Sequence, residues 1–209
     1  MIWKKRQLKK SRLYAILDKD LCGGNLLPLA RKIIDSGVDI IQLRFKNGET
    51  RDILRFAKVL RRFSRNKALF IVNDHIDVAL ASGADGVHLG QEDTPIEIAR
   101  KVVGDNFLIG VSCHNLRQAK IAQKCGADYV GIGPMFATST KAKEPVIGLK
   151  VLKEIKRSIR LPSFALGGIH LGNLPKIRQY DINTIAVGKA ICQAQDIEER
   201  VSRFKKLLN

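Results

Sequence analysis

The chain has 209 residues, of which 45% are hydrophobic, and 37 Lys and Arg against 20 Asp and Glu give a net charge of +17. This length and composition predict one domain with a full core, near the lower limit of about 200 residues for a (β/α)8 barrel. The four cysteines show neither CxxC pairing nor zinc-ligand spacing, which excludes a disulfide-built secreted domain. Without a signal segment or a long apolar span, we expect a soluble, cytoplasmic protein that does not bind membranes.

Only residues 4–12, KKRQLKKSR, form a true basic cluster. We expect residues 1–12 to be a solvated basic leader before a barrel at residues 13–209. Elsewhere, Lys and Arg are spread along the expected helices with few aromatic residues between them, which argues against nucleic-acid binding. The positive charge is then available to attract small phosphorylated substrates.

Strand-like and helix-like segments alternate from residue 13 onward. The expected strands cover residues 13–18, 40–43, 68–72, 86–89, 107–112, 128–134, 162–168 and 183–190. The expected helices cover residues 25–37, 50–64, 76–83, 95–104, 115–126, 149–160, 174–180 and a last segment ending at 208. Eight such units without a composition shift predict a single-domain α/β protein with a closed (β/α)8 TIM barrel. The alternative is a doubly wound sheet, but residues 17–25, LDKDLCGGN, lack the G-x-G-x-x-G fingerprint.

A short motif recurs after three of the expected helices, as SGVD, SGAD and CGAD at residues 36–39, 82–85 and 125–128. A glycine just after a helix is typical of a C-cap. We therefore interpret the repeat as helix-to-strand loops on the face of the barrel that serves stability.

Two carboxylates follow successive strand-like segments: Asp74 comes after residues 68–72, and Asp93 comes after residues 86–89. In a parallel sheet both emerge at the carboxyl edge, where ligands bind in α/β folds. Two hard oxygen ligands suit Mg²⁺, which lets water and a substrate phosphate complete its coordination. The structural alternative is that Asp74 caps the next helix and Asp93 starts the turn before Thr94 and Pro95.

Many other polar residues also lie at or just beyond the carboxyl ends of expected strands, which predicts an active site at that rim. They are the four histidines His75, His88, His114 and His170, together with Arg44, Lys46, Asn73, Gln91, Ser112 and Lys141.

The same rim has features of a phosphate site. Gly167 and Gly168 end the seventh strand, Val187 and Gly188 end the eighth, and such turns can expose backbone N–H groups to a phosphate. The long loop at 135–148 adds hydroxyls and an ammonium group at Thr138, Ser139, Thr140 and Lys141. No arrangement of residues indicates a protein nucleophile. These features predict an Mg²⁺-assisted reaction of a diphosphate with a second phosphorylated molecule.

Together, several strings resemble the thiamine-phosphate synthase family over about residues 13–191: QLRFK at 42–46, NDHIDVAL at 73–80, GADGVHLGQED at 83–93, GVSCH at 110–114, GADYVGIGPMFATSTK at 126–141 and ALGGI at 165–169. The resemblance implies a transferase that joins 4-amino-2-methyl-5-hydroxymethylpyrimidine diphosphate to thiazole phosphate. The implied products are thiamine monophosphate and diphosphate, and the implied mechanism is dissociative.

The resemblance also implies roles for individual residues. Asp74 and Asp93 would hold Mg²⁺, and Gln42 and Ser112 would surround the pyrimidine. Diphosphate oxygens would be contacted by Arg44, Lys46, Asn73 and Lys141, and thiazole phosphate by Thr138, Thr140, Gly168, Val187 and Gly188. The implied catalytic residues are Lys141, Arg44 and Ser112.

Three residues depart from the family pattern, and each could alter substrate affinity: Phe45, His75 and Lys189. One alternative function is a thiazole tautomerase using His114 for proton transfer, although Asp74, Asp93 and the TSTK loop favour the synthase. A second is a non-catalytic barrel that binds a phosphorylated ligand or nucleic acid. The oligomeric state and the form of thiazole phosphate stay open.

Overall fold

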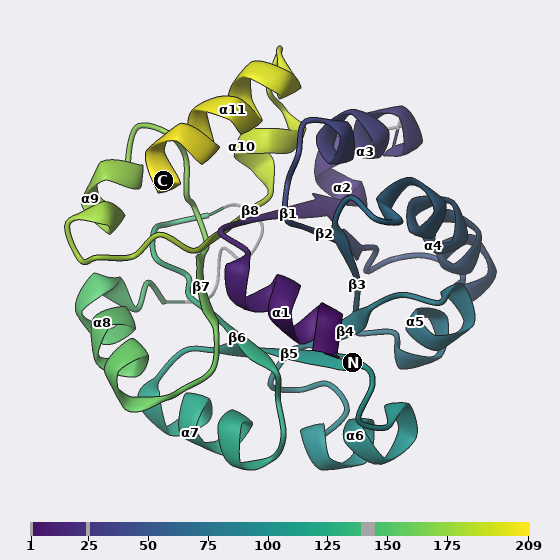
Figure 1. The fold of residues 1–209 in the computed structure, drawn as a ribbon, viewed down its shortest axis with the longest axis horizontal. Coiled ribbons are helices and arrows are strands. Elements are labelled where there is room, and N and C mark those ends of the chain that lie inside the picture. Colours follow the sequence, from purple (N-terminus) through teal and green to yellow (C-terminus); the bar gives the residue numbers. More distant parts are fainter. Residues whose placement is uncertain (1, 24–25, 139–144) are drawn as a thin grey trace.

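The computed structural model describes residues 2–23, 26–138 and 145–209. Eight parallel strands follow one another around a closed barrel, in which β1 pairs with both β2 and β8 (Figure 1). The strands are β1 (Leu13–Asp18), β2 (Ile40–Arg44), β3 (Leu69–Asn73), β4 (Gly86–Leu89), β5 (Leu108–Cys113), β6 (Tyr129–Ile132), β7 (Ser163–Leu166) and β8 (Ile185–Val187). The predicted (β/α)8 barrel is therefore confirmed.

Helices form a ring around the barrel. They are α2 (Lys19–Cys22), α3 (Leu26–Asp35), α4 (Thr50–Ser64), α5 (Ile76–Ser82), α6 (Ile96–Val103), α7 (Leu116–Lys124), α8 (Gly148–Ser158), α9 (Leu174–Arg178), α10 (Lys189–Cys192) and α11 (Ile197–Leu208). In α4 the buried residues Ile53, Ala57 and Leu60 recur at helical spacing, so one stripe packs on the strands. No helix in the described ranges is both long and apolar enough to cross a membrane.

Several expected elements differ from the observed ones at their ends. The expected helix at 25–37 begins as α3 at Leu26, and Asn25 lies outside the described residues; a separate short helix, α2, precedes it. The expected strand at 183–190 ends at Val187, because Gly188 leaves the extended conformation (φ −103°, ψ −89°) and α10 starts at Lys189.

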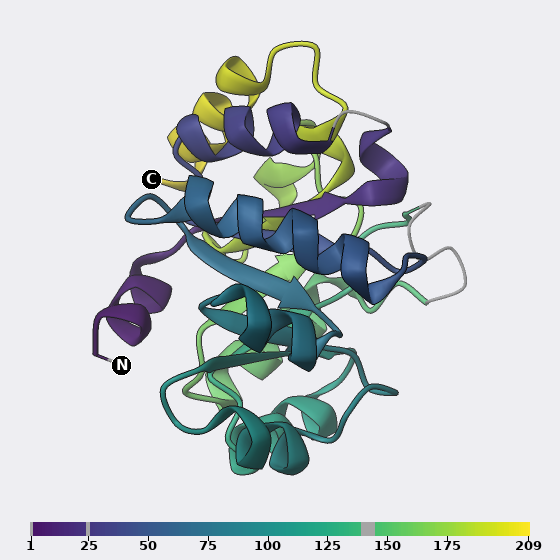
Figure 2. The ribbon, with the colours of Figure 1, turned by 90° about the vertical axis from the view of Figure 1, so that its right-hand side faces the viewer.

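The basic N-terminal segment is not a solvated leader. Residues 2–10 form α1 (Ile2–Lys10), which lies under the barrel on the side where the strands begin (Figures 1 and 2). Leu8 is 2% exposed and joins the apolar cluster inside the barrel. Two lysines anchor the helix: Lys4 Nζ lies 3.3 Å from Asp85, and Lys5 Nζ lies 3.1 Å from Asp128. One buried leucine and two ion pairs thus fix a segment whose composition indicates only charge.

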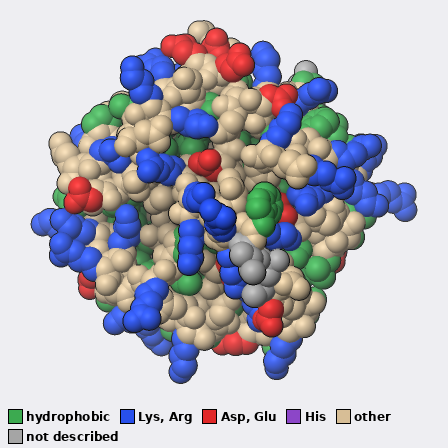
Figure 3. Space-filling model, in the orientation of Figure 1, with side chains coloured by type: hydrophobic (Ala, Val, Ile, Leu, Met, Phe, Trp, Pro, Cys, Tyr) green, Lys and Arg blue, Asp and Glu red, His purple; other side chains and the backbone are tan. Residues whose placement is uncertain are grey.

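Figure 3 shows the face that carries α1, where Lys and Arg side chains are spread around the whole ring instead of forming one patch. The repeated Gly-x-Asp motif lies on this side. Gly37, Gly83 and Gly126 have φ of 88°, 69° and 91°, values that L residues rarely adopt. The aspartates tie strand starts together, because Asp39, Asp85 and Asp128 accept hydrogen bonds from the backbone N–H groups of Leu13, Phe70 and Ile109. The repeat therefore has the expected structural role.

Candidate active site

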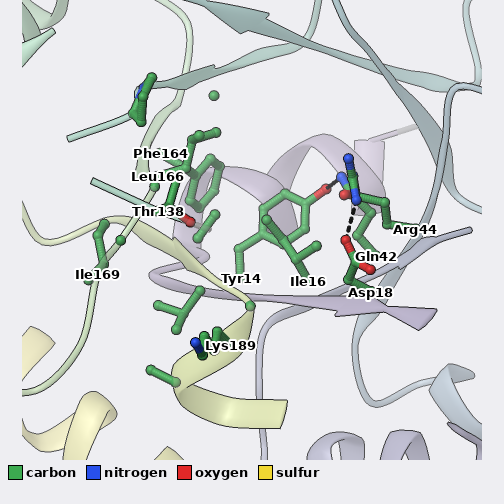
Figure 4. A pocket seen from close by; sticks show the side chains of 18 of the residues that line it. Tyr14, Ile16, Asp18, Gln42, Arg44, Thr138, Phe164, Leu166, Ile169 and Lys189 are labelled. Atoms are coloured by element: carbon green, nitrogen blue, oxygen red, sulfur yellow. Dashed lines mark hydrogen bonds and ion pairs between the residues drawn. The ribbon is translucent and has the colours of Figure 1, made fainter. Parts of the chain in front are cut away.

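A cavity of about 550 Å³ opens at the carboxyl ends of the strands, opposite α1. That volume falls within the range of small-molecule sites, roughly 300–1,000 Å³. Figure 4 shows Asp18, Gln42 and Arg44 grouped at one end of the cavity, and Thr138, Ile169 and Lys189 at the other. Strand alternation explains part of the lining, since Tyr14, Ile16 and Asp18 are every second residue of β1.

The cavity floor is a chain of buried hydrogen bonds that crosses the barrel. Gln42 Nε2 donates to Tyr14 Oη (2.7 Å), Tyr14 Oη lies 3.0 Å from Tyr129 Oη, and Tyr129 Oη lies 3.2 Å from His88 Nδ1. His88 Nε2 then lies 3.0 Å from Ser112 Oγ. The chain joins β2, β1, β6, β4 and β5, so it fixes the orientation of Gln42 and Ser112 towards the cavity.

Burial raises the pKa of Tyr14 and of Tyr129 above the usual value for a phenol. Both groups therefore stay protonated and neutral near pH 7, and they act as hydrogen-bonding groups and not as bases. The sequence interpretation missed both tyrosines, because it treated their strands as apolar runs. Their in-facing positions at alternate residues of β1 and at the start of β6 were the available signal.

Arg44 reaches the cavity from the end of β2 and forms an ion pair with Asp18 at the end of β1. Both side chains are shielded from water, with 11% and 3% of their surfaces exposed. Asp18 also caps α2 by accepting a hydrogen bond from the N–H of Asp20 at 3.0 Å. The sequence interpretation included Asp18 only as the end of a strand, although its position there resembles that of Asp74.

Asp74 and Asp93 lie close enough to share a proton. Burial raises the pKa of Asp74 to about 7, and the hydrogen bond and charge of Asp93 act in the same direction, against the smaller effects of Lys46 and Arg44. The backbone of Asp74 is left-handed (φ 62°), a conformation that Asp tolerates better than most residues, and its N–H donates to the carbonyl of His88 at 2.9 Å.

The local structural roles of the two aspartates differ. The N-cap of α5 is His75, without a side-chain bond, so the alternative that Asp74 caps this helix is wrong. One oxygen of Asp93 accepts a hydrogen bond from the N–H of Gly90 at 2.6 Å, so Asp93 closes the loop after β4.

This pair fits a divalent cation. Two facing carboxylates in a partly buried position repel each other when both are ionised, and a cation between them removes that repulsion. Within the described ranges, no group of three or more His, Cys, Asp or Glu is arranged to hold a metal. A two-carboxylate set suits Mg²⁺, which keeps water and phosphate oxygens as its other ligands.

The other end of the cavity is built by backbone. Met135 N–H and Phe136 N–H donate to the carbonyls of Leu166 and Gly167, at 2.8 and 3.1 Å, so the loop after β6 lies directly on the end of β7. Gly168 has φ of 65°, and a Cβ there would come within 2.5 Å of the Ala137 carbonyl oxygen. Only glycine fits this contact. Thr138, Gly168, Val187 and Gly188 all line the cavity here.

Of the remaining expected site residues, Asn73 lines the cavity and is 9% exposed, while Lys46 is exposed and acts on Asp74 electrostatically. Gln91 Nε2 donates to the Ser112 carbonyl at 2.6 Å and thereby supports the cavity wall. Thr140 and Lys141, like Ser139, lie outside the described residues.

The histidines have different positions. His88 and His170 line the cavity, but His75 and His114 do not. His114 Nδ1 lies 2.6 Å from the carbonyl oxygen of Gly133, so this ring ties the end of β5 to the loop after β6. Phe45, one of the departures from the family pattern, is 3% exposed and packs on Phe56 with ring centroids 5.8 Å apart. It therefore belongs to the helix layer and not to the cavity.

The fold and the cavity define a class of protein: a (β/α)8 barrel whose cavity, at the carboxyl ends of its strands, combines an arginine and a glycine-lined wall and has paired carboxylates beside it. Comparison with known proteins identifies the family. The family model for thiamine monophosphate synthase matches residues 13–191. The chain belongs to this family, and it is a transferase.

Individual members of the family are similar to this chain over nearly its whole length. The thiamine-phosphate synthase of Coprothermobacter proteolyticus is 42% identical, covering 100% of both chains, and that of Methanosarcina barkeri is 39% identical over 94% of this chain and 90% of its own. Among solved structures, the thiamine phosphate pyrophosphorylase of Pyrococcus furiosus superposes with a TM-score of 0.87 at 36% identity, covering 98% of this chain and 97% of its own.

Proposed function

We propose that this chain joins 4-amino-2-methyl-5-hydroxymethylpyrimidine diphosphate to thiazole phosphate, giving thiamine monophosphate and diphosphate. The observation that carries the proposal is that one cavity has two chemically different ends. Arg44 and Asn73 line one end, with Asp74 and Asp93 beside them, and the glycine-lined wall at Gly168 and Gly188 lies at the other. A substrate with a diphosphate and a second substrate with a single phosphate match these two ends.

In this proposal Asp74 and Asp93 hold Mg²⁺. When bound, the ion would neutralise charge on the diphosphate and so favour its departure. Arg44, held by Asp18, and Asn73 bind diphosphate oxygens from the protein side. Lys46 adds positive charge near the same end, and the expected role of Lys141 is to contact the leaving group.

The floor of the cavity positions the pyrimidine. Gln42 and Ser112 present fixed polar groups to the ring, because each is held by the hydrogen-bond chain through Tyr14, Tyr129 and His88. The neutral tyrosines cannot act as nucleophiles near pH 7, which agrees with a dissociative mechanism in which diphosphate leaves first. The aminopyrimidine then stabilises the methylene cation, and the thiazole nitrogen captures it.

The thiazole phosphate is bound at the opposite end by Thr138 and Thr140, with the backbone at Gly168, Val187 and Gly188. Pre-orientation of two substrates in one closed cavity lowers the entropic part of the barrier to their joining.

The decisive experiment is an assay for thiamine monophosphate from the two purified substrates, with Mg²⁺ and with a chelator in excess. The expected result is product formation that depends on Mg²⁺, with one diphosphate released for each thiamine monophosphate. Absence of product with both substrates and Mg²⁺ present would reject the proposal. Equal rates with and without the chelator would reject the metal assignment alone.

A further inference from the structure

Arg200 of α11 (Ile197–Leu208) reaches the cavity wall formed by α10. Its Nη1 donates to the carbonyl oxygen of Ala190 at 2.9 Å, and the residue is half-buried. Lys189 and Gln193 line the same wall. A guanidinium has five N–H donors, so one hydrogen bond to a carbonyl fixes its position and leaves other donors for a ligand.

Neither Arg200 nor Lys189 forms an ion pair with any carboxylate in the described part of the chain. By contrast, Arg44 pairs with Asp18 inside the cavity, and Arg203 pairs with Glu199 on the outer side of α11 at 3.7 Å. Nearby acids are also engaged, since Asp196 caps α11 through the N–H of Glu199. A half-buried guanidinium beside a lysine, with no carboxylate of residues 2–23, 26–138 or 145–209 paired to it, is an environment suited to a ligand anion.

The position of this pair indicates which anion it would meet. Lys189 directly follows Gly188, and Ala190, the partner of Arg200, is the next residue. Figure 4 shows Lys189 on the side of Thr138 and Ile169, away from the ion pair of Asp18 and Arg44. The two cations are therefore at the end of the cavity opposite the ion pair of Asp18 and Arg44.

We infer that Arg200, with Lys189, makes this site selective for the phosphorylated thiazole group over the same group with a free hydroxyl. This inference rests on the proposed function. Arg200 contributes a fixed, planar donor set, and Lys189 contributes a mobile point charge at the more exposed edge. Both favour a phosphate dianion and gain nothing from an uncharged alcohol.

The test compares two ligands that differ only in that phosphate: thiamine monophosphate, the proposed product, and thiamine. Titration calorimetry measures both dissociation constants for the wild type, Arg200→Gln, Lys189→Ser and the matched control Arg203→Gln. Arg203 lies on the same helix but is 61% exposed and pairs outward.

We expect Arg200→Gln to raise the dissociation constant of thiamine monophosphate about tenfold, the size of one charge-assisted contact, and to leave that of thiamine unchanged. Lys189→Ser should weaken the binding of thiamine monophosphate by a smaller factor, because the charge of Lys189 is more exposed to water. Arg203→Gln should change neither dissociation constant. Arg200→Lys, which retains the charge but not the planar donor set, should lie between the wild type and Arg200→Gln.

Two results would overturn the inference while leaving the proposed function intact. One is an unchanged ratio of the two dissociation constants in Arg200→Gln. The other is an equal loss for both ligands, which would show that Arg200 only holds Ala190 in place. A wild-type protein that binds neither ligand and forms no thiamine monophosphate would overturn both the function and the inference.

Discussion

Asp18 and Arg44 lie opposite each other in the register of β1 and β2, and their ion pair fixes the arginine at the end of the cavity where we propose that the diphosphate binds. A buried pair is weak evidence for stability, since desolvation offsets much of its attraction. Removing one partner has a larger effect, because the other charge is left without compensation. Asp18 is therefore best understood as a positioning residue for Arg44.

Asp18→Asn should lower kcat by about tenfold or more, with little effect on the KM for thiazole phosphate, and should reduce stability by about 3 kcal/mol. The reason is that Arg44 loses the charge that orients it towards the diphosphate. Steady-state kinetics and urea unfolding check the two effects. Asp20→Asn, at an exposed position of the short helix that Asp18 caps, is the control, and equal kinetics for the two variants would contradict the positioning role.

Asp74→Asn and Asp93→Asn should each reduce turnover sharply and raise the Mg²⁺ concentration needed for half-maximal rate. The loss corresponds to several kcal/mol, on the order expected for a metal that stabilises developing charge. Asp77→Asn, exposed on α5, should behave as wild type. Normal activity of either site variant at limiting Mg²⁺ would remove that residue from the metal site.

The raised pKa of Asp74 predicts that, without Mg²⁺, this residue lowers stability as pH rises. Because its folded-state pKa of about 7 lies above 3.8, the usual pKa of an aspartic acid, its stabilising contribution is complete below pH 4 and is lost between pH 4 and 7. Partial exposure limits the change to about 2 kcal/mol.

The measurement is the difference in free energy of unfolding between the wild type and Asp74→Asn across that pH range, with a chelator present. The wild type should lose stability relative to the variant towards pH 7, and saturating Mg²⁺ should reverse the trend. A constant difference with pH would show that Asp74 titrates normally.

Tyr129→Phe should weaken the binding of the pyrimidine substrate and reduce the free energy of unfolding by about 1–3 kcal/mol, since Tyr14 and His88 would both lose a buried hydrogen-bond partner. Thermal unfolding and the KM for the pyrimidine diphosphate report the two effects. Tyr180→Phe removes a hydroxyl outside the cavity and provides the control. If the pyrimidine KM is the same in all three proteins, the hydrogen-bond chain does not position the ring.

Leu8→Ala should reduce stability by about 2–4 kcal/mol without changing kcat or either KM, because Leu8 fills the barrel from the end opposite the cavity. Chemical denaturation and the synthase assay separate these effects. Leu207→Ala, at an exposed position of α11 (42%), should reduce the free energy of unfolding much less. A Leu8→Ala protein as stable as the Leu207→Ala protein would show that α1 is not part of the core.

Strand and helix order was predictable because hydrophobic period and glycine C-caps are local signals. The closeness of Asp74 and Asp93 was also predictable, because parallel strands bring their carboxyl ends to one edge. The pairing of Asp18 with Arg44 and the contact of Tyr14 with Tyr129 depend on barrel closure and on which strand residues face inward. Arg200 approaches from the last helix, and no spacing along the chain marks it. The docking of α1 depends on charges at Asp85 and Asp128, far away in sequence.

Because α1 covers one end of the barrel and side chains fill the interior next to it, the cavity is open only at the carboxyl ends of the strands. In the proposed reaction, both substrates would then enter, and both products leave, through the same rim. A shared entrance constrains the order of events, because a bound product would block the arrival of the next substrate. Turnover would thus respond to accumulated product more strongly than in a barrel open at both ends.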